Sequence, residues 1–157
     1  AAAILEELHC PFVINQNRYS ILDRKIEQNG LKQCAAQAGK GIIAFSPLAQ
    51  GLLTNRYLNG IPADSRIRTD GRFLKESSLT PEKRKQLQAL SRIAEGRGQT
   101  LAEMALSWLL RSPEVTSVLV GASKPEQILE NIGALRHTAF TEDELKAIDT
   151  ACEQAPN

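Results

Sequence analysis

Three short apolar runs in the sequence each end in residues that could bind a polar ligand. The runs are PFVINQ (11–16), GIIAF (41–45) and SVLV (117–120). Gly121, Ser123 and Lys124 follow the last run, where a helical pattern begins. Free backbone amides at the start of a helix favour an anion, and a nearby lysine adds positive charge. The chemistry indicated at this junction is the binding of a phosphate group.

The helical segment after Ser123 carries an apolar face and a polar ridge. The apolar residues are Ile128, Leu129, Ile132 and Leu135, and the polar residues are Gln127, Glu130 and Asn131. The ridge has the i, i+3, i+4 spacing of one helix face, and it could hold a polar heterocycle with its ribose. Ser123 and Glu126 also match an S-x-x-E capping box. The alternative is that these two residues only cap the helix while the ridge faces solvent.

A long segment with little regular pattern, residues 45–80, follows the second run. Loops longer than about 12–15 residues are usually functional or disordered. We expect an ordered loop because five apolar side chains could pack within it: Leu48, Leu52, Leu53, Tyr57 and Leu58. Arg56 and Arg66 are always charged, planar donors suited to phosphate, whereas Arg68 and Arg72 are expected to be solvated.

The first run ends in INQNRY, which places Gln16 at the end of a strand. Its amide offers both a donor and an acceptor, which matches a ligand carboxamide. The alternative is a buried glutamine satisfied by neighbouring backbone, and that alternative is favoured for Gln16 taken alone.

The elements that position these residues alternate between strand and helix. The apolar, β-branched runs are typical of parallel strands buried on both faces. Helices are expected over residues 23–39, with a break near Asn29 and Gly30, over 100–112, and after the N-caps Thr80 and Thr141. The alternation fits either a closed barrel or a doubly wound sheet. Since a barrel needs about eight strands, we expect residues 1–157 to form one partial domain.

Composition excludes several classes of function. The chain has 157 residues, 42% of them hydrophobic, and its 19 Lys and Arg balance 18 Asp and Glu. A net charge of +1 does not favour nucleic acid, and no stretch approaches the roughly 20 apolar residues of a membrane span. Three cysteines without a CxxC motif predict neither disulfides nor a zinc site and fit a reducing cytoplasm. The opening AAAILEELHC has helical spacing but no cap, so we expect an N-terminal part of a longer protein to be absent.

Taken in order, four motifs resemble the aldo-keto reductase superfamily along nearly the whole chain. They are FVINQNRYSIL, GIIAFSPLAQGLLTNRY, GIPADSR and VLVGASKPEQILENI. The resemblance is strongest to the branch with bacterial glyceraldehyde-3-phosphate-type reductases and potassium-channel β subunits. It implies an α/β fold, with this chain forming the last three β/α units of a (β/α)8 TIM barrel.

The resemblance implies NADP(H) as the cofactor, bound in extended form across the barrel mouth. Gln16 would hold the nicotinamide carboxamide, and Phe45 would stack on the nicotinamide ring. Arg56 and Arg66 would reach the phosphate and adenosine portions. The residues implied along the pyrophosphate are Ser46, Pro47, Leu48, Gln50 and Gly51.

The same resemblance assigns the far end of the cofactor to the junction after the third run. Gly121, Ser123 and Lys124 would surround the adenosine 2′-phosphate. The polar ridge of Gln127, Glu130 and Asn131 would receive the adenine and its ribose.

The family's chemistry is hydride transfer from NADPH to an aldehyde or ketone, with a tyrosine as general acid supported by Lys, Asp and His. Tyr19, Tyr57, His9 and His137 do not stand in that motif, so no catalytic residue and no metal ligand is assigned. The first hypothesis is that the full-length protein reduces small-molecule carbonyls and that this portion alone is inactive. The alternative is a non-catalytic NADP(H)-binding regulatory subunit of the channel type, although Asp64 stands where that branch has an aromatic residue. A third hypothesis is self-association into a homo-oligomer.

Overall fold

The computed structural model describes residues 2–58, 60–61 and 76–153. Its strands are β1 (Ile14–Arg18), β2 (Gly41–Phe45) and β3 (Val115–Leu119). Its α-helices are α1 (Ala2–Glu7), α2 (Lys25–Gln28), α3 (Leu31–Gln37), α5 (Pro81–Gly96), α6 (Leu101–Leu110), α7 (Pro125–Gly133) and α8 (Glu142–Glu153). Short 3-10 turns lie at Ala49–Gly51, Asn55–Tyr57, Glu76–Ser78 and Ala134–Arg136.

The three strands form one parallel sheet in the order β1-β2-β3. Gln16 pairs with Ile43, and Phe45 pairs with both Arg18 and Leu119. β2 coincides with the predicted run, and the predicted helix over residues 23–39 is broken between α2 and α3 at Gly30, which has a φ of 75°. β1 begins three residues later than predicted, and β3 begins two residues earlier.

The prediction that the strands are buried on both faces is wrong for the described chain. Ile42 and Ala44 are fully buried, but Phe45 on the opposite face is 37% exposed and Leu119 is 47% exposed. The reason is that side chains alternate along a strand, and the helices cover only the face that carries Ile42 and Ala44. The other face of the sheet carries Gln16 and Phe45 and has no covering layer among the described residues.

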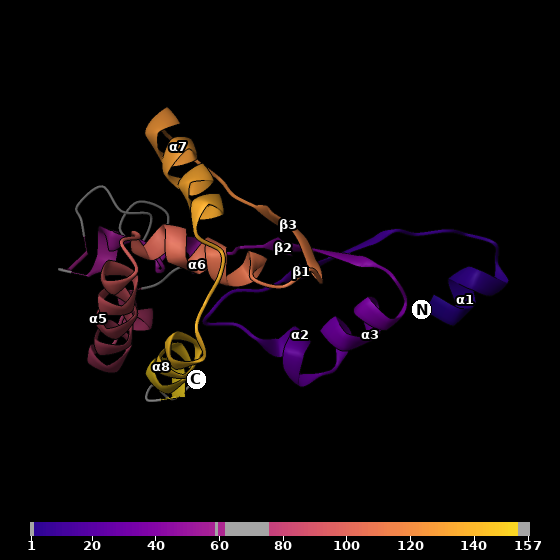
Figure 1. Cartoon of the computed structure of the whole chain (residues 1–157), viewed down its shortest axis with the longest axis horizontal. Coiled ribbons are helices and arrows are strands. Elements are labelled where there is room, and N and C mark those ends of the chain that lie inside the picture. The colour runs from indigo at the N-terminus through magenta and orange to yellow at the C-terminus, as the bar shows by residue number, and fades with distance from the viewer. Residues whose placement is uncertain (1, 59, 62–75, 154–157) are drawn as a thin grey trace.

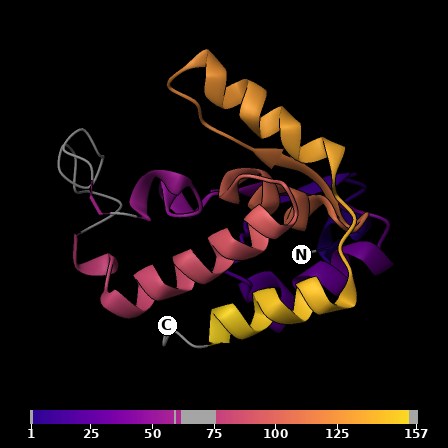
Figure 2. The same ribbon diagram turned by 60° about the vertical axis from the view of Figure 1, so that its left-hand side comes forward.

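The core lies between the covered face of the sheet and the helices. It is centred on α6, which contacts β3 and α7, while α5 packs on α8. In both views α5 and α8 lie side by side, and α7 extends away from them (Figures 1 and 2). The apolar face of α7 is exposed, with Leu129 at 69% and Ile132 at 54%, and Leu135 in the turn after α7 is 63% exposed. α1 buries no residue.

Three helix starts agree with the sequence prediction. The Thr80 hydroxyl accepts from the Lys83 N–H at the start of α5, where Pro81 takes the first helical position. Thr100 and Glu103 form a reciprocal capping box on α6. Thr141 and Glu144 exchange the same pair of bonds at α8. No helix in the described ranges is long and apolar enough to span a bilayer.

Candidate functional site

Two segments that follow neighbouring strands face each other across a cavity of about 490 Å³. One segment is the loop after β2, and the other is the junction from the end of β3 into α7. Parallel strands end at one edge of a sheet, so these two segments are brought to the same edge. The predicted site residues that line the cavity are Ser46, Pro47, Leu48, Gln50, Gly51, Arg56, Gly121, Ser123, Gln127, Glu130 and Asn131.

Three predicted site residues do not line this cavity, and a fourth lies outside the described residues. Gln16 and Phe45 lie on the uncovered face of the sheet, because Gln16 pairs with Ile43 and Phe45 stands two residues further along β2. Gln16 is exposed, so it is not the buried glutamine of the alternative interpretation. Lys124 is exposed at the N-cap of α7, and Arg66 lies outside the described residues.

The cavity also includes residues that the sequence analysis did not select: Thr54, Asn55, Tyr57, Ala102, Leu119 and Val120. Thr54 had a usable signal, since it stands before a short turn that it caps. Its hydroxyl donates to the Gly51 carbonyl at 2.7 Å and accepts from the Arg56 N–H at 3.3 Å. Ala102 had no such signal, because it belongs to α6 and reaches the cavity only through tertiary packing.

The loop after β2 has an unusual backbone. Ser46, Ala49 and Gln50 all have positive φ, at 53°, 47° and 59°, and Gly51 follows at 96°. A residue other than glycine in this region costs on the order of 1–3 kcal/mol, and such strain concentrates at ligand sites. Three buried side chains hold residues 46–58 of this loop in place, as expected for that part: they are Leu52, Leu53 and Tyr57. Residues 59 and 62–75 of the predicted loop, which include Arg68 and Arg72, lie outside the described residues.

The predicted capping box of Ser123 and Glu126 does not form, which is a correction. The N-cap of α7 is Lys124 and no side chain caps it, so Glu126 stands one position too early for the box. Instead the Ser123 N–H and hydroxyl both approach the side-chain oxygen of Gln127, at 2.8 and 3.3 Å. In this structure the amide of Ser123 is therefore occupied by a group from its own chain.

The buried polar atoms of the site include one that has no partner. The side-chain oxygen Oε1 of Gln50 is buried and accepts no hydrogen bond from any described residue. Other atoms of Gln50 line the cavity, whereas this oxygen is itself shielded from solvent.

Neither tyrosine has the exposed hydroxyl that a general acid needs to reach a substrate. Tyr19 is fully buried, and its hydroxyl donates to Glu27 Oε1. Burial, reinforced by the Glu27 carboxylate, raises the pKa of Tyr19 well above its ordinary value. Tyr57 is 2% exposed and forms part of the cavity wall. No group of three His, Cys, Asp or Glu side chains that could hold a metal ion occurs within the described ranges.

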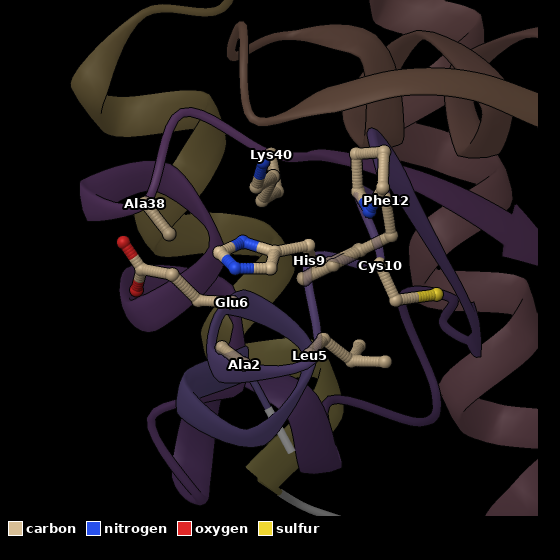
Figure 3. A pocket seen from close by; sticks show the side chains of 9 residues that line it. Ala2, Leu5, Glu6, His9, Cys10, Phe12, Ala38 and Lys40 are labelled. Atoms are coloured by element: carbon tan, nitrogen blue, oxygen red, sulfur yellow. The ribbon is translucent and has the colours of Figure 1, made fainter.

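A second cavity of about 640 Å³ lies at the opposite end of the strands (Figure 3). It is lined by α1, by the segment before β1 and by Lys40, which precedes β2. Lys40 Nζ lies 4.9 Å from the centre of the Phe12 ring, and every lining residue is exposed or half-buried. Ligands of parallel α/β folds bind at the carboxyl ends of the strands, which favours the first cavity.

Comparison with known proteins agrees with the family expected from the sequence and with the α/β fold. Residues 1–153 match the model of the aldo/keto reductase family. The chain belongs to this family. It resembles a solved thermostable aldo-keto reductase in complex with the inhibitor epalrestat, with a TM-score of 0.64 and 26% identity over 95% of this chain and 44% of that one.

Two curated proteins are similar to the chain in sequence. The chain is 48% identical over 149 residues to L-glyceraldehyde 3-phosphate reductase of Escherichia coli O157:H7, covering 93% of this chain and 43% of that protein. It is 38% identical over 148 residues to a putative voltage-gated potassium channel subunit beta of Schizosaccharomyces pombe, covering 92% and 43%. The chain therefore spans less than half the length of these relatives.

Proposed function

We propose that the chain supplies most of the NADP(H) site of a protein that reduces aldehydes or ketones. The observation that carries the proposal is that most of the predicted cofactor residues, which come from two separate segments, line one cavity at the carboxyl edge of the sheet. When bound, NADPH would supply the hydride for the reduction. The carbonyl substrate would be a small molecule, and we propose a cytoplasmic location.

The chemistry of the cavity fits this dinucleotide. The strained loop from Ser46 to Gly51 would follow the pyrophosphate, and Arg56 would add a permanent positive charge. At the other wall, the Gln127 side chain would release the Ser123 N–H, which would then donate to the 2′-phosphate, with Lys124 beside it. Glu130 and Asn131 would receive the adenosine.

The uncovered face of the sheet would carry the reactive end of the cofactor. Phe45, 37% exposed at the end of β2, offers a ring for stacking, and Gln16 on the same face offers both a donor and an acceptor to a carboxamide. The same face has room for further (β/α) units. We propose that residues 1–157 form one partial domain of a TIM barrel whose general acid lies in another part of the protein.

The exposed face of α7 supports this division. Ile128, Leu129 and Ile132 on α7, and Leu135 in the turn that follows it, are each at least half exposed, and a monomeric protein rarely leaves such a face uncovered. Preceding barrel units would cover this face. Self-association into a homo-oligomer is the competing explanation, and it predicts a mass above 17.2 kDa for the chain alone in solution.

Joining this chain to the part of the Escherichia coli reductase that precedes the matched residues tests the proposed reaction. We expect the hybrid to oxidise NADPH when an aldehyde is added, while the 157-residue chain alone does not. The intact relative serves as the reference, and circular dichroism shows that the hybrid is folded. A folded hybrid that binds NADPH but never oxidises it with any carbonyl would contradict a reductase function. That result would favour the regulatory-subunit alternative, which is motivated by the similarity to the channel β subunit.

A preference for the phosphorylated cofactor should depend on Lys124. We expect the chain to bind NADPH about tenfold or more tightly than NADH, because a charge-assisted contact to one phosphate contributes roughly 1.5–3 kcal/mol. Lys124→Ala should weaken NADPH and leave NADH unchanged, as measured by cofactor fluorescence. Lys146→Ala, which removes an exposed lysine from α8, is the matched control. Equal affinities for both cofactors in the unmodified chain would count against a 2′-phosphate site at this junction.

A further inference from the structure

Arg18 ends β1 on the uncovered face of the sheet. It pairs with Phe45, the last residue of β2, and Phe45 pairs with Leu119 at the end of β3, so these three side chains form one row. Tyr19, the next residue, is fully buried on the covered face, as the alternation of side chains requires. Neighbouring strands lie about 4.8 Å apart, so Arg18 flanks Phe45 on the side away from Leu119 and the 490 Å³ cavity.

The Arg18 side chain is held by an ion pair although it is exposed. Its Nε lies 3.3 Å from Asp23 Oδ2, and the two side chains are 52% and 22% exposed. Asp23 is itself fixed, because its N–H donates to the hydroxyl and the carbonyl of Ser20, at 3.1 and 3.2 Å, and Ser20 is buried. An exposed ion pair contributes little to stability. The stability of the fold therefore gives little reason to orient this guanidinium.

The contact with Asp23 uses only part of the guanidinium. The group has five N–H donors in a planar fork, and its ion pair is made through Nε. Within the described part of the chain, Asp23 is the only partner of the Arg18 side chain. The two Nη groups can therefore bind a carboxylate or a phosphate through two parallel hydrogen bonds. Arginine keeps its charge at every physiological pH, so this capacity is permanent.

The position of Arg18 relative to Phe45 determines which anion it would meet. In the proposed function the pyrophosphate follows the loop that lines the cavity, and the nicotinamide stacks on Phe45. Hydride transfer requires the substrate carbonyl to lie in contact with the nicotinamide ring. Arg18 stands on the other side of Phe45 from the cofactor phosphates. An anion bound by Arg18 would therefore belong to the substrate.

We propose that Arg18 is a specificity-determining residue that binds an anionic group of the substrate. The substrate class is a small aldehyde or ketone that also carries a phosphate or a carboxylate. Asp23 is a positioning residue, because it orients the guanidinium through Nε. This proposal rests on the proposed function, since it assumes that the nicotinamide lies against Phe45.

The hybrid with the preceding part of the Escherichia coli reductase tests the proposal with two matched pairs of aldehydes. We compare para-carboxybenzaldehyde with para-methylbenzaldehyde, and glycolaldehyde phosphate with glycolaldehyde, so that each pair differs in its anion. In at least one pair, kcat/KM should be about tenfold or more higher for the anionic member, mainly through a lower KM. The pair with the larger ratio identifies carboxylate or phosphate as the preferred anion.

Arg18→Gln should lower this ratio about tenfold, because glutamine is polar but carries no charge. Arg18→Lys keeps the charge without the planar fork and should lose less of the ratio. Arg84→Gln, at an exposed position of α5, is the matched control and should retain the ratio. Circular dichroism shows whether each variant is folded. A merely structural role of Arg18 would lower kcat/KM for both members of a pair alike.

The outcomes separate this proposal from the proposed function. Equal kcat/KM within both pairs in the unmodified hybrid, or a preference that survives Arg18→Gln, would overturn the role of Arg18 and leave the reductase function intact. An equally large loss of NADPH affinity in the Arg18→Gln chain, measured by cofactor fluorescence, would also overturn it, because the contact would then be with the cofactor. A hybrid that reduces no carbonyl would overturn the proposed function and this proposal with it.

Discussion

Replacing Trp108 by alanine should lower the free energy of unfolding by about 3–5 kcal/mol, the range for removing a large buried aromatic side chain. Trp108 is 1% exposed, and its ring centre lies 5.5 Å from that of Tyr19. The guanidinium carbons of Arg24 and Arg111 lie 4.5 and 3.8 Å from the Trp108 ring. The variant would lose packing and two cation–π contacts at once.

Circular dichroism in urea measures this effect, because Trp108 is the only tryptophan and its fluorescence disappears with the substitution. Trp108→Phe keeps an aromatic ring and should lose clearly less stability. If Trp108→Ala and Trp108→Phe unfolded at the same urea concentration as the unmodified chain, the position of α6 in the core would be wrong. Because Ala102 lies on α6 and lines the cavity, the alanine variant should also bind NADPH less tightly.

Replacing Arg97 by methionine should lower the free energy of unfolding by a similar amount, about 3–5 kcal/mol. The substitution removes a buried guanidinium, and the groups that it contacts lose their donor. The Arg97 side chain is 1% exposed, and its Nη1 lies 2.6 Å from Glu144 Oε2. Its Nη2 donates to the carbonyls of His137 and Ala139, at 3.1 and 2.9 Å. The guanidinium also lies 3.6 Å from the centre of the Phe140 ring. Arg97 therefore joins the end of α5 to the segment that leads into α8.

The Arg97 prediction has a second readout in acid. Partial burial opposes ionisation of Glu144, but hydrogen bonds from the Thr141 N–H and from Arg97 outweigh it and hold the pKa of Glu144 below its ordinary value. A lowered pKa in the folded state stabilises the fold at neutral pH, and this contribution is lost as the pH falls below about 4.5. Urea unfolding at pH 7 and pH 4 should show a smaller difference in Arg97→Met than in the unmodified chain. Arg92→Met, at an exposed site of α5, should match the unmodified chain at both values.

The sequence allowed the sheet to be predicted better than its boundaries. GIIAF is bounded by Gly41 and by the Ser-Pro pair after Phe45, and it coincides with β2. Before β1 the apolar run includes Pro11, which has no N–H to donate, and pairing starts only where the Gly41 N–H meets the Val13 carbonyl. Burial of the sheet could not be predicted, because an apolar run does not reveal whether another layer covers its second face.

The site was predictable where it depends on strand order and not where it depends on tertiary packing. Parallel strands end together, so the meeting of Gln50 with Gln127 follows from the order of the elements. Ala102 could not be found, because its place is set by how α6 packs. The S-x-x-E pattern failed because Pro125 starts α7 one residue later than a cap at Ser123 would require. The positive φ of Ala49 could not be predicted, because alanine does not favour this conformation and only Gly51, two residues later, indicates a turn.

Amide NMR spectra of the chain, recorded while NADPH is added, test the central claim directly. The account predicts the largest shifts in the loop after β2, residues 46–57, and in the junction of β3 with α7, residues 119–131, which form most of the cavity wall. The ends of β1 and β2 near Gln16 and Phe45 should respond through the nicotinamide. A spectrum that does not change, or that changes only around His9, Phe12 and Lys40 in the other cavity, would contradict it.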